Sequence, residues 1–365
     1  MRFGFRLAAI FSVQSMFAAV PVSAQDGDGV PHATAALAAS SPVIDGRLDD
    51  AAWLQAPPIG SFVQREPLEG EPPSERTEIR IVHDAAALYI GAWLFDRESG
   101  SLVLGETRRD ADLGDTDAIR IVLDTYLDRQ NGFVFGTTPA GIQYDGQVTR
   151  EGQGGFGGSA RQQRGSGGGF NLNWDGSWEV ATTRDTAGWY AEFRIPFSTL
   201  RYGAGGAQRW GLNIARTIRR RNEEVVWSPV PRQFDLYRVS SAGVVEGFDA
   251  PAQRILTVTP YVLGSARRDY AGSNDVDTDA EVGGDAKIGV TPSMTLDLTV
   301  NTDFAQVEVD DEQVNLTRFQ LFFPEKRPFF LENAGTFSVG TPQEVEIFFS
   351  RRIGIESGAA VPILG

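Results

Sequence analysis

The chain has 365 residues, of which 41% are hydrophobic, and its formal charge is −15. The lack of cysteine excludes disulfides, thiolate nucleophiles and Cys-ligated metal clusters, and two histidines are too few for a multi-histidine metal site. The acidic charge argues against nucleic acid as a partner, because phosphate backbones are themselves negative. The abundance of glycine and of aromatic residues is typical of an all-β protein with many tight turns.

The N-terminal residues 1–24 predict a cleaved export signal. Two arginines precede a mostly apolar stretch from Leu7 to Val20, and Val22-Ser23-Ala24 supplies the small residues of a cleavage site. A membrane anchor is the alternative, but this apolar stretch is too short to span a bilayer. Residues 25–42, rich in Ala, Gly, Asp and Pro, are expected to form a flexible leader.

Short strands separated by Gly, Pro and Asp clusters are expected from residue 43 to residue 249. The clearest strand candidates are Thr77–Asp84, Leu88–Phe95, Ala118–Leu123, Gly132–Thr137, Trp178–Thr183, Trp189–Ile195 and Trp210–Ile218. Their β-branched and aromatic content predicts an antiparallel β-sandwich. The glycine-rich stretch 152–169 within this domain is expected to form a mobile loop.

Residues 250–365 show a different pattern, with longer and more regular strands. In Met294–Asn301 apolar and polar residues alternate strictly, and Ile255–Leu263 is a strand of similar length. One apolar and one polar face fit a transmembrane β-barrel, in which lipid contacts one face, although a half-buried sheet of a soluble domain is the alternative. Because such a barrel needs at least eight strands, we expect only the first strands of a truncated barrel here and interpret the chain as a fragment.

Several segments in the first domain resemble the family 9 carbohydrate-binding module. The matching segments are Val43–Trp53, Thr77–Asp84, Leu88–Asp96, Asp115–Asp124 and Gly188–Phe197. The resemblance covers residues 43–249 and depends on the order and spacing of these segments. It implies a β-sandwich that binds a poly- or oligosaccharide and carries structural calcium.

The second part resembles an uncharacterised bacterial outer-membrane β-barrel domain. The matching segments are Asn301–Asp310, Asn315–Phe319, Leu321–Glu332, Phe348–Gly354 and Val361–Gly365. Members of that group place a family 9-like sandwich before the barrel. The resemblance implies a location in the cell outer membrane, with membrane lipid as a partner. Because bacterial barrels usually begin from the periplasmic side, we expect the sandwich to lie in the periplasm.

Four aspartates are the best candidates for a metal site. Calcium takes several oxygen ligands, and Asp110, Asp112, Asp115 and Asp117 lie close together in a glycine-containing segment. Their spacing differs from that of an EF-hand, because Gly114 occupies the position of the fifth loop ligand. Solvated surface charge is the alternative interpretation.

Candidate saccharide contacts are three tryptophans and one pair of charged residues. Trp174, Trp178 and Trp227 follow turns and could each present a ring face to a sugar, whereas burial in the core is the alternative. On the strand at 188–197, Glu192 and Arg194 share the face opposite the apolar residues. Their alternative role is a cross-strand ion pair.

The preferred function is a non-catalytic carbohydrate-binding or uptake module tethered to an outer-membrane barrel. A glycoside hydrolase of carbohydrate catabolism is one alternative. It needs two carboxylates about 5 Å or about 6.5–9.5 Å apart, and the sequence singles out no such pair, so we predict no catalytic residue. A periplasmic plug or docking domain that binds no sugar is the third possibility.

Overall fold

The computed structural model describes residues 29–152, 169–172, 174–203, 205–252, 256–268, 276–291 and 294–301, together with isolated short stretches between 340 and 360. The predicted export signal, most of the glycine-rich stretch and the segment Pro324–Glu332 lie outside the described residues. None of the helices in the described part is both long and apolar enough to cross a membrane.

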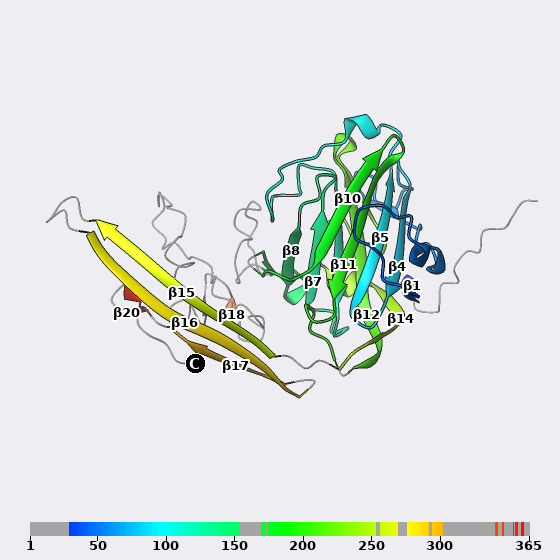
Figure 1. Ribbon diagram of the computed structural model, residues 1–365. Helices are drawn as coiled ribbons and strands as arrows, with labels where there is room; N and C mark the ends of the chain where they lie inside the picture. Colours follow the sequence, from blue (N-terminus) through cyan, green and yellow to red (C-terminus); the bar gives the residue numbers. More distant parts are fainter. Residues whose placement is uncertain are drawn as a thin grey trace, which may run out of the picture.

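Two β-sheets packed face to face form the first unit (Figure 1). The main path of the large sheet runs β1 (His32–Thr34), β14 (Gly243–Ala250), β12 (Gly206–Ile218), β6 (Ala118–Asp124), β7 (Gly132–Thr137), β8 (Tyr144–Val148) and β9 (Phe170–Asn171), and β13 (Glu223–Val226) with β3 (Val63–Glu66) extends from β12. The small sheet runs β10 (Glu179–Asp185), β11 (Gly188–Pro196), β5 (Ala87–Phe95), β4 (Thr77–His83) and β2 (Ala36–Leu37). All pairings are antiparallel except β1–β14 and β2–β4.

The core lies between the two sheets and follows the alternation of the sequence. On β11, Trp189, Phe193 and Ile195 point inward and are fully buried. They meet inward residues of the large sheet such as Trp210 and Phe135. The predicted all-β sandwich is confirmed, and the predicted strands agree with β4, β5, β6, β7, β10, β11 and β12 to within a few residues.

Irregular segments add a further layer on the outer face of each sheet. Over the small sheet, the segment 38–56 includes η1 (Ala51–Gln55) and packs Trp53 against the strands. Gly91 of β5 makes room for this contact, because a Cβ there would lie 2.8 Å from Leu48 and 3.1 Å from Trp53. Over the large sheet, a second apolar cluster includes Tyr237. The remaining short helices are η2 (Ser99–Ser101), η3 (Arg150–Gly152), η4 (Arg219–Arg221) and η5 (Val239–Ser241).

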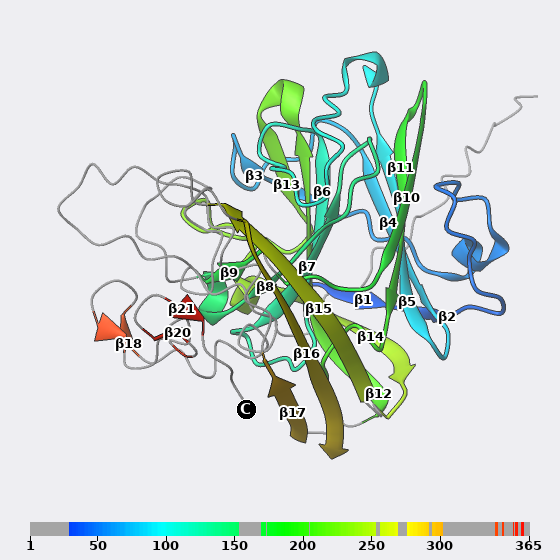
Figure 2. The same ribbon diagram turned by 60° about the vertical axis from the view of Figure 1, so that its left-hand side comes forward.

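A separate three-stranded sheet follows the sandwich in the chain. It consists of β15 (Leu256–Arg268), β16 (Val276–Thr291) and β17 (Met294–Val300); Figure 2 shows β15 and β16 as long strands and β17 as a shorter one. The register places Leu256 opposite Ile288, and Ile288 opposite Leu296. Beyond it, two-residue strands pair as β18 (Gly340–Thr341) with β19 (Val345–Glu346), and as β20 (Ile355–Glu356) with β21 (Ala359–Ala360).

The two faces of this sheet differ sharply in polarity. One face carries large apolar side chains that are exposed, and these are Leu256, Val258, Val262, Val282, Ile288, Leu296, Leu298 and Val300. On the other face the Thr299 hydroxyl donates to Asp285 at 2.5 Å, and Lys287 pairs with Asp297 at 3.7 Å. The alternation expected for 294–301 is therefore present in β17.

Candidate functional site

Two of the three predicted stacking tryptophans are core residues. Trp178 and Trp227 each keep only 4% of their surface exposed. The Trp178 ring stacks on Phe193 with a centroid separation of 5.8 Å and contacts Phe135 edge-on. Because a sugar needs an open ring face, burial removes both tryptophans from the candidate saccharide contacts, and the alternative of core packing applies to them.

Glu192 is also buried rather than displayed. It lies beneath the turn at residues 45–46, and its Oε2 accepts backbone hydrogen bonds from Asp45 at 3.0 Å and Gly46 at 2.8 Å. Its Oε1 accepts a hydrogen bond from the Trp53 side chain, whose Nε1 lies 3.1 Å away. Desolvation, the largest effect, raises the pKa of Glu192 to about 7 despite these three donors. The predicted saccharide contact at Glu192 is therefore wrong, and its role is to hold the covering segment on the small sheet.

Arg194 stays at the surface and forms a cross-strand ion pair. Its Nη1 lies 2.6 Å from Glu179 Oε1, and the two residues face each other in the β10–β11 register. The alternative of a cross-strand ion pair is thus the observed arrangement for Arg194, and its partner is Glu179 of the neighbouring strand.

The carboxylates of the four aspartates predicted to bind calcium are engaged by protein partners. Asp112 accepts from the backbone of Gly114 at 2.9 Å, and Asp115 pairs with Arg219 at 2.8 Å. Buried Asp117 accepts from the backbone amides of Val103 and Arg219, and Asp110 accepts from that of Asp145. Within the described ranges no three His, Asp or Glu side chains come together in a group suited to a metal. The four aspartates therefore do not gather into one group, and structural calcium stays a prediction.

Trp174 is the remaining tryptophan candidate, and it is a partly buried residue that packs against the core of the sandwich. Its ring is partly buried and packs on one side against Phe133, at 5.0 Å between centroids, and Phe135. Gly176 allows the loop to pass closely, because a Cβ there would lie 2.7 Å from the Trp174 ring. The ring is thus held rigidly while part of its surface remains accessible.

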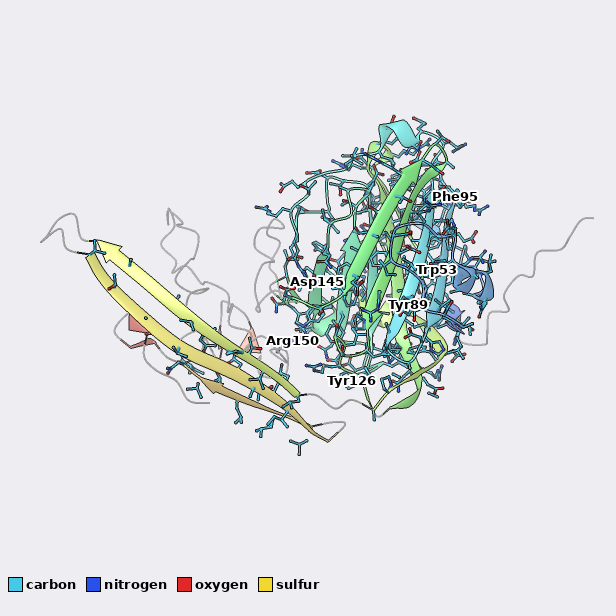
Figure 3. All side chains as sticks on the ribbon, viewed as in Figure 1. Trp53, Tyr89, Phe95, Tyr126, Asp145 and Arg150 are labelled. Carbon is cyan, nitrogen blue, oxygen red and sulfur yellow. The ribbon has the colours of Figure 1, made fainter. Side chains whose placement is uncertain are left out.

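Beside Trp174, one arginine joins three segments that are far apart in the chain. Arg109 Nη2 lies 2.5 Å from Asp145 Oδ1 and also pairs with Asp175. Its Nη1 donates to Gln143 Oε1 at 2.9 Å. Asp145 Oδ2 in turn accepts from the backbone of Gly176 at 2.7 Å, which fixes the loop that carries Trp174. We call Arg109, Asp110, Asp145, Trp174 and Asp175 the Arg109 site; Figure 3 labels Asp145.

The carboxylates of the Arg109 site differ in exposure and in proton affinity. Asp145 is fully buried, and desolvation raises its pKa, whereas the side chain of Asp175 is 73% exposed. Burial, reinforced by the charge of Asp145, raises the pKa of Asp110 to about 6. Three carboxylates around one guanidinium leave local negative charge, so the site is suited to accept hydrogen bonds from hydroxyl groups.

The sequence predicts one residue of this site, Trp174, as a saccharide contact and gives no indication of the arginine at its centre. Asp175 is recognisable in the sequence as a carboxylate next to Trp174, and Asp110 is predicted there as a calcium ligand. Arg109 and Asp145 are separated from Trp174 along the chain, and no motif connects them. Only the pairing of β7 with β8 and the return of the loop before β10 bring these residues together.

A second ionic group lies on the outer face of the large sheet. Arg65 Nε and Arg120 Nη2 lie 2.6 Å and 2.5 Å from the two carboxylate oxygens of Glu224. The arginines hold the pKa of Glu224 below its usual value, although burial acts in the opposite direction and is the largest effect. The side chains are at most 18% exposed, so this group joins β3, β6 and β13 rather than presenting an open site.

Comparison with known proteins gives partial matches. The family model of a domain of unknown function, DUF5916, matches residues 251–361. No curated protein matches the sequence.

Among solved structures, the sandwich is similar to a family 9 carbohydrate-binding module from Caldicellulosiruptor kristjanssonii. Its complex with glucose shows 14% identity and a TM-score of 0.40 over 61% of this chain and 97% of that chain. Its complex with cellotriose has a TM-score of 0.39 at 14% identity, over 61% and 95% of the two chains. A protein from Bacteroides uniformis has a TM-score of 0.45 at 10% identity, over 60% of this chain and the whole of that chain.

Proposed function

We propose that the sandwich is a saccharide-binding module whose ligand contacts the Arg109 site. The observation that carries this proposal is a rigidly packed, partly exposed tryptophan next to an exposed carboxylate and a guanidinium held by several acceptors. A pyranose places its C–H face on an aromatic ring while its hydroxyls bond to polar groups at the edge of that ring. Trp174 supplies the ring, and Asp175 and Arg109 supply the polar groups.

Hydrogen bonds within the sandwich hold the side chains of the Arg109 site in place. Asp145 and Gln143 hold the Arg109 guanidinium, and Gly176 ties the loop of Trp174 to Asp145. Binding therefore costs little ordering entropy, which favours affinity for a small, flexible sugar.

Removing the Trp174 ring should lower saccharide affinity about tenfold or more, which corresponds to about 1.4 kcal/mol. The measurement is calorimetric titration of the full chain with mono- and oligosaccharides of the gluco-, xylo- and manno-series, comparing wild type with Trp174→Ala. Tyr126→Ala is the matched control, because Tyr126 is another exposed aromatic residue of the sandwich (Figure 3). Equal affinities for wild type and a folded Trp174→Ala variant would remove the Arg109 site from sugar binding.

A reducing-sugar assay on the same saccharides separates binding from hydrolysis. The raised pKa of Asp110, about 6, is the specific observation that favours acid catalysis at the Arg109 site. We expect no hydrolysis, because Arg109 and the Asp145 backbone engage the neighbouring carboxylates in the structure. Release of reducing sugar by wild type that is lost in Asp110→Asn would establish a glycoside hydrolase instead.

We further propose that β15, β16 and β17 are outer-membrane barrel strands whose apolar face contacts lipid. The segregation of apolar and polar residues in register across three strands supports this, as does the exposure of the apolar face. Soluble proteins rarely expose so large an apolar face to water, because its hydration is unfavourable. On this proposal the sandwich lies in the periplasm, joined to β15 by residues 251–255.

A charge on the apolar face should prevent membrane insertion. Val282, in the middle of β16, is 67% exposed, and Val282→Lys is expected to cost about 2–4 kcal/mol at the bilayer centre. We expect the protein expressed from its full-length gene to fractionate with the outer membrane, and the Val282→Lys variant to be depleted there. Thr259→Lys on the polar face is the control and should fractionate like wild type.

Digestion of intact cells with added protease tests on which side of the outer membrane the sandwich lies. Protection until the outer membrane is permeabilised supports the periplasmic location. Digestion in intact cells would place the sandwich on the cell surface, and normal fractionation of Val282→Lys would contradict the lipid-facing role of β16.

A further inference from the structure

An aromatic stripe runs across the outer face of the small sheet, where the covering segment 38–56 ends. Tyr190 of β11 and Trp93 of β5 are direct partners in the register, and Phe95 follows two residues later on the same face of β5. The Cβ atoms of such neighbours lie about 5–7 Å apart, so the three aromatic side chains follow one another on one face of the sheet. All three rings are partly exposed, whereas Leu94 between Trp93 and Phe95 points inward and is fully buried.

The covering segment packs beside this row and holds one ring in place. Trp53 meets Trp93 edge-on, with 6.3 Å between the ring centroids and an interplanar angle of 88°. Figure 3 labels Phe95, Trp53 and Tyr89, which follow one another along this side of the sandwich. The rings are therefore fixed on a flat sheet rather than carried by a loop.

Charged side chains accompany the rings and neutralise one another. The Arg76 guanidinium lies 4.2 Å from the Phe95 centroid, and that of Arg80 lies 5.3 Å from the Trp93 centroid. Glu78 pairs with both arginines at 2.8 Å. At the other end of the row, the Tyr190 hydroxyl donates to Asp185 at 3.1 Å, so two arginines balance two carboxylates.

This combination restricts the chemistry of a ligand. An anion would meet Glu78 and Asp185, and a cation would meet Arg76 and Arg80, so neither gains net attraction. A purely apolar partner would bury the polar groups without satisfying them. A neutral chain of hydroxylated rings satisfies both features, because its C–H faces pack on aromatic rings while its hydroxyls bond to guanidinium and carboxylate groups.

We propose that the row formed by Tyr190, Trp93 and Phe95, with Arg76 and Glu78, binds an extended neutral polysaccharide. This surface is distinct from the Arg109 site. The two surfaces lie at opposite ends of β10. Gln143 bonds to Arg109 and also to the backbone of Trp178, just before β10 begins. Asp185, which bonds to Tyr190, is the last residue of β10. Seven strand residues span about 20 Å, so the two surfaces contact different parts of a long chain.

The test compares variants of the full chain on long and short ligands. Depletion isotherms on insoluble cellulose and affinity electrophoresis on xylan and mannan measure polysaccharide binding, and titration with the matching mono- and disaccharides measures the Arg109 site. Tyr190→Ala should weaken polysaccharide binding about tenfold and leave short-sugar affinity unchanged. Tyr190→Phe keeps the ring and should bind within about threefold of wild type. Arg76→Ala, at an exposed position, tests the polar edge without removing a packed ring.

The outcomes separate this proposal from the one for the Arg109 site. A Tyr190→Ala variant with unchanged melting temperature and wild-type polysaccharide binding would overturn the aromatic surface, whatever Trp174→Ala does. Loss of polysaccharide binding in Tyr190→Ala but not in Trp174→Ala would support the aromatic surface and count against the Arg109 site. If wild type binds none of the polysaccharides tested, the proposed aromatic surface is rejected as well.

Discussion

Replacing Arg216 with methionine should lower the free energy of unfolding of the sandwich by about 3–5 kcal/mol. Arg216 lies on β12 of the large sheet, points between the sheets and is fully buried. Its Nη1 donates to the backbone oxygen of Arg76 at 2.9 Å and its Nη2 to that of Phe95 at 2.7 Å. One side chain thereby joins β12 to the small sheet through hydrogen bonds inside an otherwise apolar layer.

The acidic groups around Arg216 increase the cost of losing it. Burial lowers the pKa of Arg216 to about 10, while Asp96, Asp117 and Glu75 act in the opposite direction. The guanidinium therefore stays charged at neutral pH and compensates carboxylates that are themselves buried. Methionine fills much of the volume but leaves two carbonyl oxygens without this donor, and it removes a positive charge that acts on the buried carboxylates.

Urea unfolding followed by tryptophan fluorescence measures the effect, because all seven tryptophans lie in the sandwich. Arg209→Met is the matched control on the same strand. Arg209 is 60% exposed and pairs with Glu246 at 3.1 Å, so its loss should cost less than about 1 kcal/mol. A loss for Arg216→Met as small as that of the control would show that the buried guanidinium contributes no net stability.

Glu192 should make the stability of the sandwich depend on pH between about 4.5 and 7. Its pKa rises from 4.5 to about 7 on folding because burial disfavours the charged carboxylate. The folded state thus binds the proton more tightly than the unfolded state. The contribution of this group is complete below pH 4.5 and is lost as the pH rises to about 7, and it amounts to about 3 kcal/mol at 1.36 kcal/mol per pKa unit.

Glu192→Gln isolates this contribution, because the amide stays neutral at every pH. Its NH2 group cannot accept the hydrogen bond from Trp53 Nε1, so the variant should be less stable than wild type at pH 5. The difference should shrink by up to about 3 kcal/mol at pH 8, where wild type carries the buried charge. Glu179→Gln, at an exposed position on β10, should show no such change. Parallel pH profiles for wild type and Glu192→Gln would contradict the raised pKa.

Local sequence pattern was enough to predict the strands of the sandwich. In Gly188–Pro196 each inward residue is apolar, and the period of two places Trp189 and Phe193 in the core irrespective of which strands lie beside them. The same period in Met294–Val300 predicts one apolar and one polar face for β17. These features depend on a single strand, so the sequence of that strand determines them.

The same pattern misjudged residues on outward faces. Alternation places Glu192 opposite Phe193 and so toward solvent, yet the segment 38–56 covers it and its carboxylate anchors the turn at Asp45 and Gly46. Trp227 was predicted near a turn and is buried in the core. Whether an outward side chain is buried depends on which distant segment packs over the sheet. The sequence of the strand itself does not indicate that segment.

By itself, the sequence of this protein determined the strands, their apolar faces and the all-β class, because side-chain alternation is a property of neighbouring residues. Only the tertiary structure decided which polar residues act together. The four aspartates between 110 and 117 are close in sequence, but they do not act together: Asp112 bonds within its own turn, Asp115 and Asp117 bond to Arg219, and Asp110 bonds to Asp145. Arg109, Asp145 and Asp175 are distant in sequence, yet one guanidinium joins them. Strand order and loop return bring such groups together, and both depend on long-range packing rather than on local sequence.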